Sequence, residues 1–84
     1  MSRLIIKNSK DMGSVIRTRR KTLGLTQREL VDVAPFGITF ISDLENGKET
    51  AQLNKAIETL KMLGLRLIIE APDESDVSQQ EARP

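Results

Sequence analysis

Residues 26–48 constrain the fold of this 84-residue chain more than any other stretch. Thr26 is a preferred N-cap residue, and Glu29 three positions later completes a capping box, so a helix is predicted to begin here. Pro35 interrupts that helix, because proline has no amide proton and moves the preceding residue out of the helical conformation. A second short helix is predicted to end at Asn46-Gly47, since both residues tolerate the left-handed backbone of helix ends. The stretch therefore predicts a helix-turn-helix.

Two helices of this length bury little surface alone, so flanking helices must fix their geometry. A first helix is predicted over residues 9–23, with Ser9 as its N-cap, and a last helix over residues 51–63. Gly13 inside the first helix lowers helix propensity and suggests close packing there. Apolar side chains spaced three and four apart are expected to form one core, namely Met12, Val15, Ile16 and Leu23, then Leu30, Val33 and Ala34, then Ile41 and Leu44, and finally Leu53, Ala56, Ile57, Leu60 and Leu63.

Two short apolar segments near the chain ends are predicted as strands. Residues 3–7 (Arg-Leu-Ile-Ile-Lys) nearly recur as residues 66–70 (Arg-Leu-Ile-Ile-Glu), with the second strand predicted over 65–70. A lone two-stranded ribbon is marginal in water, and an exposed apolar edge invites a partner. We therefore expect pairing between two subunits, with a ribbon inside one chain as the alternative. Residues 72–84 hold four acids and one large apolar residue, which predicts a disordered acidic tail after a domain of residues 1–71.

Composition argues against several classes of protein. The chain contains no cysteine and no histidine, which leaves no disulfide, no ordinary zinc site and no side chain that titrates near neutrality. Without His or Cys, and without a glycine loop for phosphates, nothing supplies a nucleophile with its base. We expect no enzyme, no cofactor and no metal. No apolar run approaches the ~20 residues of a membrane span and no signal peptide is evident, so a cytoplasmic protein is expected.

The charge is unevenly distributed along the chain. Residues 1–28 carry eight Lys or Arg against one acid, although the net charge of the whole chain is only +1. A basic half of this kind favours contact with phosphates, with a plain solvated helix surface as the alternative. Arg17, Lys21 and Arg28 are the electrostatic candidates.

The motifs resemble a known family. Thr26-Gln27-x-Glu29-Leu30, followed without a gap by Ile41-Ser42-x-Leu44-Glu45-Asn46-Gly47-Lys48, resembles the Cro/CI (XRE) helix-turn-helix regulators over about residues 9–65. Residues 40–45 and 63–67 resemble the HipB-type antitoxins. Pro35 stands where the family usually has the turn glycine, and Gly37 where a capping Ser or Thr is common. The resemblance implies a mainly α, four-helix lambda-repressor-like domain, with C-terminal strands that pair across a dimer through Leu67, Ile68 and Ile69.

The resemblance also implies the site residues. The family's base contacts fall on Gly37, Ile38, Thr39, Ser42 and Asp43, and its phosphate clamp on Gln27. Asn46 and Lys48 flank the far side of the second helix and are expected to contact phosphates from their position. None of the five base-facing residues is Arg, Lys, Asn or Gln, so hydrogen-bond recognition should be sparse and DNA shape should matter. Phe40 is expected to pack rather than to wedge between bases. The family also pairs an arginine at Arg20 with a glutamate at Glu45, which predicts a structural ion pair.

These features favour a dimeric, sequence-specific repressor that binds a double-stranded DNA operator in the cytoplasm, at the nucleoid. Resemblance alone implies that it is the antitoxin of a HipBA-like operon, that it represses this operon, and that it binds a HipA-like kinase toxin. Two alternatives remain open. One is a stand-alone XRE-type regulator without a toxin, and the other is an interaction-only antitoxin subunit with weak DNA binding.

Overall fold

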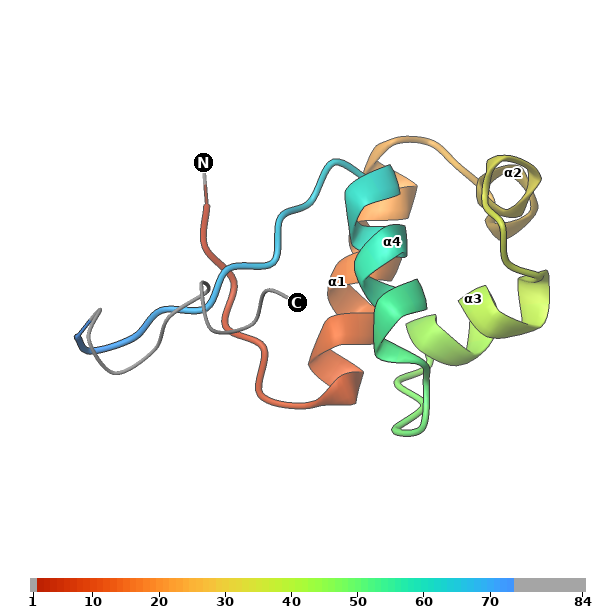
Figure 1. Cartoon of the computed structure of the whole chain (residues 1–84). Coiled ribbons are helices and arrows are strands. Elements are labelled where there is room, and N and C mark those ends of the chain that lie inside the picture. Colours follow the sequence, from red (N-terminus) through yellow and green to blue (C-terminus); the bar gives the residue numbers. More distant parts are fainter. Residues whose placement is uncertain (1, 74–84) are drawn as a thin grey trace, which may run out of the picture.

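The computed structural model describes residues 2–73 and contains four helices in that range. They are α1 (Ser9–Thr22), α2 (Gln27–Val33), α3 (Ile38–Glu45) and α4 (Leu53–Met62). In Figure 1, α2 and α3 stand on one side of α1 and α4, and α3 packs against both α1 and α2. The four predicted helices are confirmed, and their bounds differ from the prediction by at most two residues. None of the helices within residues 2–73 has the length and apolarity needed to cross a membrane.

The helix starts agree only in part with the predicted caps. The side chain of Asn8, rather than that of Ser9, caps α1 by accepting a hydrogen bond from the Asp11 amide at 2.9 Å. The capping box of α2 is confirmed, because the Glu29 amide donates to Thr26 Oγ1 at 3.1 Å and the Thr26 amide donates to Glu29 Oε1 at 3.0 Å. Two of the otherwise unpaired amides at the start of α2 are thereby satisfied.

The end of α3 has the closure known as a Schellman motif. The Gly47 amide donates to the Leu44 carbonyl at 3.1 Å, and the Lys48 amide donates to the Asp43 carbonyl at 3.0 Å. Gly47 has φ +81°, a left-handed conformation that costs glycine little because it has no Cβ. The pair Gly24 and Leu25 ends α1 in the same way, and Gly64 and Leu65 end α4. Three helices therefore stop at defined residues, which fixes where the connecting loops leave.

Seven buried apolar side chains from all four helices and their ends form the core: Ile16, Leu30, Ile41, Leu44, Ala56, Leu60 and Leu63. Three predicted core residues are wrong, since Leu23 is 45 %, Val33 74 % and Leu53 66 % exposed. In each case an apolar side chain two positions away packs against the core instead, namely Leu25, Val31 or Ala51. All three exposed residues lie within one position of a helix end, where the chain departs from the helical path and the 3.6-residue period no longer assigns faces.

Gly13 lies where α1 crosses the end of α3. A Cβ atom at this position would lie 2.6 Å from the carbonyl oxygen of Glu45 and nearer still to that of Leu44. Because both neighbours are backbone atoms of α3, they cannot move aside without moving the helix. The close packing predicted from Gly13 is confirmed.

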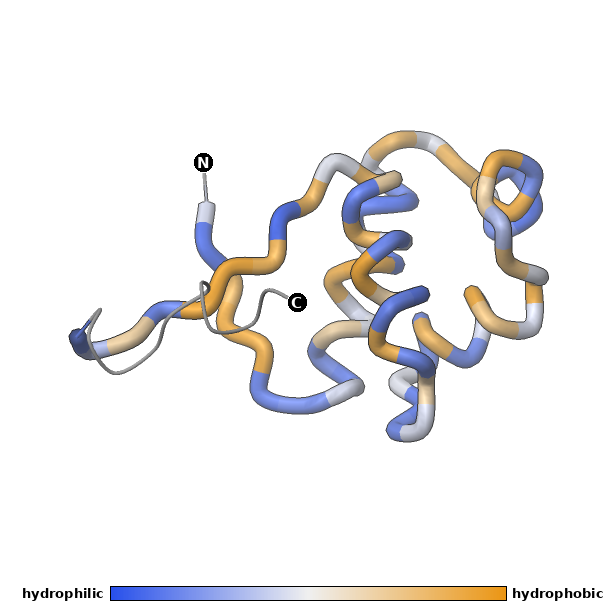
Figure 2. Tube along the Cα trace, in the orientation of Figure 1, coloured by the Kyte–Doolittle hydropathy of each residue, from blue (hydrophilic) through white to orange (hydrophobic). Residues whose placement is uncertain are grey.

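The terminal segments contain no strand anywhere in residues 2–73. Residues 3–7 and 65–70 cross in Figure 1, and an ion pair of 2.8 Å between Arg3 and Glu70 links them. Figure 2 shows apolar residues along both segments, and Ile68 and Ile69 are 68 % and 85 % exposed. The alternative of a ribbon inside one chain is thus not formed in the described part, whereas strand pairing across a dimer stays a prediction. The predicted tail lies, beyond Asp73, outside the described residues.

Candidate nucleic-acid interface

Arg20 of α1 and Glu45 at the end of α3 form the predicted ion pair. Arg20 Nε donates to Glu45 Oε2 at 2.7 Å, and Arg20 Nη2 donates to Glu45 Oε1 at 3.0 Å. Both residues are 7 % exposed. A third bond runs from Arg20 Nη1 to the carbonyl of Leu25 at 2.6 Å. The planar guanidinium therefore joins α1, the loop before α2 and α3 in one buried network.

Gln27 extends this network from the first turn of α2. Its Nε2 donates to Glu45 Oε1 at 3.1 Å, and its side chain is half-buried. The family resemblance implied a phosphate contact for Gln27, and nothing in the local pattern indicated this partner 18 residues away. In the free protein the side chain therefore helps to hold α2 against α3.

Both members of the ion pair are stabilised in their charged forms. Burial acts to raise the pKa of Glu45, but the hydrogen bonds from Arg20 and Gln27, together with the charges of Arg20 and Arg17, lower this pKa below its ordinary value. The hydrogen bond to Glu45 raises the pKa of Arg20.

The outer surface of α3 carries the predicted base-contacting residues. Gly37 is the N-cap and makes no side-chain capping bond. Ile38 is 39 % exposed, Thr39 is exposed, and Ser42 and Asp43 are half-buried. The structure thus brings four of the five onto α3, with Gly37 directly before it, and leaves part of each accessible, while Ile41 and Leu44 face the core.

The cations and polar residues expected to contact phosphates are exposed on α1, on α2 and just after α3. Arg17 is exposed on α1 and Arg28 on α2, while Asn46 and Lys48 are exposed just after α3. Lys48 Nζ is 3.3 Å from Asp43 Oδ2, so this lysine has a carboxylate partner in the free protein.

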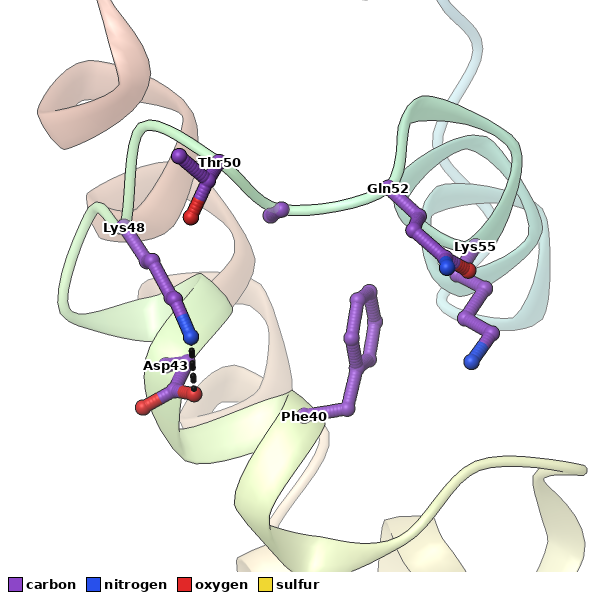
Figure 3. Close-up of a pocket in the computed structure, with 7 residues that line it drawn as sticks. Phe40, Asp43, Lys48, Thr50, Gln52 and Lys55 are labelled. Atoms are coloured by element: carbon purple, nitrogen blue, oxygen red, sulfur yellow. Dashed lines mark hydrogen bonds and ion pairs between the residues drawn. The ribbon is translucent and has the colours of Figure 1, made fainter.

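A shallow cavity of about 240 Å³ adjoins α3 on the side of α4 (Figure 3). Its lining residues are Phe40, Asp43, Lys48, Thr50, Ala51, Gln52 and Lys55. Phe40 packs on Phe36 with ring centroids 5.3 Å apart, and Lys55 Nζ lies 5.5 Å from the Phe40 centroid. These contacts agree with the expected packing role of Phe40. Thr50, Gln52 and Lys55 follow the motif in sequence, and no sequence signal placed them beside it.

A relative of known class identifies the family, although no protein-family model matches the chain. An uncharacterized HTH-type transcriptional regulator, y4mF of Sinorhizobium fredii, is 46 % identical over 69 residues, which cover 82 % of this chain and 91 % of that protein. Such identity over most of both chains assigns a regulatory rather than an enzymatic family, as the composition predicted.

Solved structures define the fold. A HipB–O2 20mer complex has a TM-score of 0.76 at 22 % identity and covers 86 % of this chain and 100 % of that one. A HipA–HipB–O2–O3 complex has a TM-score of 0.75 at 21 % identity and covers 84 % of this chain and 100 % of that one. Together, the helix-turn-helix geometry, the close relative and these structures show that the chain belongs to the HTH-type transcriptional regulators and has the fold of HipB.

Proposed function

We propose that this chain is a dimeric, sequence-specific DNA-binding repressor whose α3 enters the major groove of its operator. The observation that carries the proposal is the arrangement of α3. The network of Arg20, Gln27 and Glu45 fixes the C-terminal end of the helix, and the first turn at its other end, with Ile38 and Thr39, stays exposed. A rigid helix with an accessible N-terminal half is what insertion into the groove requires.

The side chains on this surface determine how bases would be recognised. Ile38 and the Thr39 methyl group suit thymine methyls, whereas the Ser42 and Thr39 hydroxyls can donate or accept. Because no Arg, Lys, Asn or Gln faces the bases, much of the specificity would come from DNA shape. We assign contact with phosphates, which would set the register, to Arg17, Arg28 and the backbone amides at the start of α2.

A second copy of the chain would cover the apolar segment near the C-terminus. A chain of 84 residues buries only about 60 % of its unfolded surface, and Leu67, Ile68 and Ile69 remain exposed. Antiparallel pairing of two such segments around Ile68 would cover them and place Arg66 opposite Glu70 of the second copy. Because the arrangement is two-fold symmetric, it forms two such Arg66–Glu70 ion pairs between the copies.

The antitoxin function is the finer part of the proposal. HipA and HipB occur together in one solved complex whose HipB shares this fold. We therefore propose a HipA-like kinase as the toxin partner and the chain's own operon as its target, in the cytoplasm at the nucleoid. An adjacent gene for a kinase-like protein would support this, and its absence would favour a stand-alone regulator.

A specific observation favours a second candidate, an interaction-only subunit. The outer surface of α3 carries a carboxylate at Asp43 and no cation, which is unusual for a helix that approaches phosphates. The two functions differ in whether the free chain binds DNA.

A gel-shift titration tests the proposal. The purified chain is titrated into the fragment upstream of its own gene and into a coding fragment of equal length, at several salt concentrations. We expect preferential binding upstream, with log affinity falling against log salt by about 0.9 per phosphate neutralised. Equal affinity for both fragments would contradict sequence-specific repression, and no binding to either at low salt would favour the interaction-only subunit.

A further inference from the structure

The closure of α3 brings Asp43 and Lys48 together. The hydrogen bond from the Lys48 amide to the Asp43 carbonyl, at 3.0 Å, spans the last turn and places the two side chains next to each other. In the equivalent closure of α4 the two positions are Leu60 and Leu65, an apolar pair of the usual kind. At the end of α3 the contact is instead an ion pair, with Lys48 Nζ 3.3 Å from Asp43 Oδ2 (Figure 3).

Asp43 is also an unusual residue for a helix that faces DNA. The other carboxylate of α3, Glu45, is buried against Arg20, so Asp43 provides the only accessible one on this helix, which contains no Lys or Arg. Between two rows of phosphates an unpaired carboxylate would be repelled. The last turn of α3 holds the backbone of Lys48 beside Asp43, and the Lys48 ammonium offsets the charge of the carboxylate.

We propose that Lys48 is a positioning residue, which holds the Asp43 carboxylate so that it accepts a hydrogen bond from a cytosine amine in the major groove. The proposal rests on the proposed function and deepens it by naming a recognised base. Asp43 can only accept, and the exocyclic amines of cytosine and adenine are the donors in this groove. Beside the adenine amine lies the N7 acceptor, which repels the second carboxylate oxygen. Cytosine presents a C–H group there, so cytosine is preferred.

The competing role for Lys48 is contact with a phosphate. In the free protein its ammonium already pairs with Asp43, and the two side chains are 54 % and 39 % exposed. An exposed pair of this kind contributes little in water, but displacement of water by DNA lowers the local dielectric and strengthens it. Because the pair is already formed, little additional ordering is needed on binding.

In vitro selection from a random-sequence duplex library tests this inference with the full chain. The wild type, Lys48→Met, Asp43→Asn and the double variant are compared, and each is then titrated on the selected duplex with all four bases at each position. We expect the wild type to enrich cytosine at one position of each half-site. Asp43→Asn should shift that position to adenine, because an amide bonds both its N6 and its N7. Lys48→Met should reduce the preference for cytosine about tenfold without changing the salt slope.

The double variant separates positioning from independent contact. In the Asp43→Asn background, Lys48→Met should leave the base preference unchanged, because the carboxylate on which Lys48 acts is gone. Lys61→Met is the matched control, since it removes an exposed lysine whose 3.6 Å partner Glu58 lies on the same helix, α4. It should change neither preference nor slope. Circular dichroism confirms that each variant is folded before it is titrated.

Each other outcome overturns a distinct statement. If Lys48→Met weakens binding equally for all four bases and lowers the salt slope by about 0.9, Lys48 contacts a phosphate and the inference is wrong. A wild-type motif that Asp43→Asn leaves unchanged overturns the inference while the proposed repressor function stands. A wild type that enriches no motif overturns the proposed function together with the inference.

Discussion

Arg20 and Glu45 form a buried ion pair through two hydrogen bonds of 2.7 and 3.0 Å, and this pair joins the last turn of α1 to the last residue of α3. Arg20 also donates a hydrogen bond to the Leu25 carbonyl, and Glu45 also accepts one from Gln27. Among the described residues, no buried side-chain nitrogen or oxygen lacks a hydrogen-bond partner. Desolvation offsets much of the attraction in such pairs, whereas loss of one partner leaves a buried charge. Removing one of the two residues should therefore destabilise the protein more than replacing both.

Arg20→Met is expected to lower the free energy of unfolding by about 3 kcal/mol, because Glu45 then lies buried without its main partner. The double variant Arg20→Met/Glu45→Leu should recover much of this loss, since it leaves neither charge behind. Urea denaturation of the wild type, both single variants and the double variant measures the coupling. Losses that simply add would show that the two residues do not interact.

Acid should destabilise the protein through Glu45. The pKa of Glu45 is lower in the folded state than its ordinary value, so its stabilising effect is present above the unfolded pKa of about 4.3 and is lost as pH falls through the lower folded value. The free energy of unfolding should thus decrease below about pH 4 more steeply in the wild type than in Arg20→Met/Glu45→Leu. Glu29, whose pKa is also lowered by hydrogen bonds with Thr26, is present in both proteins. Equal slopes in urea melts across this range would contradict the assignment to Glu45.

Gly13→Ala is expected to cost about 1–3 kcal/mol, because the new methyl group meets the backbone carbonyls of Leu44 and Glu45. The neighbouring Ser14→Ala is the control, since Ser14 is exposed on the same helix and its change should stay within about 0.5 kcal/mol. Thermal melts compare the two variants. A Gly13→Ala protein as stable as Ser14→Ala would mean that α1 and α3 separate easily.

Ile68→Pro should produce a monomer that keeps its helical spectrum, because proline removes a ladder donor from a central strand while the four helices pack locally. DNA affinity should fall steeply, since one half-site provides only half of the contacts. Deletion of residues 73–84 should change neither property, because this segment holds almost no apolar residue. Sedimentation and gel shift measure both variants. If Ile68→Pro remains dimeric and binds normally, the segment is not the dimer interface.

Charge reversal tests the register of the proposed strands. Arg66→Glu or Glu70→Arg alone should weaken the dimer, because each places like charges opposite one another across the two-fold axis, and the double variant should restore it. Within one chain, Glu70 also pairs with Arg3, but the two side chains are 65 % and 82 % exposed. Loss of this exposed ion pair should therefore have little effect on the stability of the dimer. Sedimentation equilibrium measures the dissociation constant of the dimer for each variant. A double variant no better than the singles would exclude antiparallel pairing centred on Ile68.

The sequence predicted those features whose causes are local. The capping box at Thr26 and Glu29 and the inward pair Ile41 and Leu44 depend on neighbours within one or two helical turns, and both are confirmed. Arg20 with Glu45 was found through resemblance, because 25 residues separate them and no period connects them.

The sequence-based predictions that failed depend on tertiary packing. Val33 and Leu53 have the spacing of core residues, yet the chain leaves the helix beside them and exposes them. The side chain of Gln27 bonds to Glu45 because α3 folds back against α2, which no stretch of sequence near Gln27 specifies. The strand predicted around Ile68 is not formed within residues 2–73, and Ile68 is 68 % exposed; in our proposal the surface that pairs with it belongs to a second copy of the chain.

The position of the Arg20 network has a consequence for how such a regulator changes during evolution. Stability depends on the end of α3, at Leu44 and Glu45, whereas Ile38 and Thr39 occupy its first turn and contribute little to the core. Mutations in that first turn can therefore accumulate with little loss of folding free energy. With α3 recognising DNA as proposed, a duplicated gene of this type can acquire a different operator while it keeps its scaffold, and neighbouring operons in one genome can be regulated by relatives that do not interfere with each other.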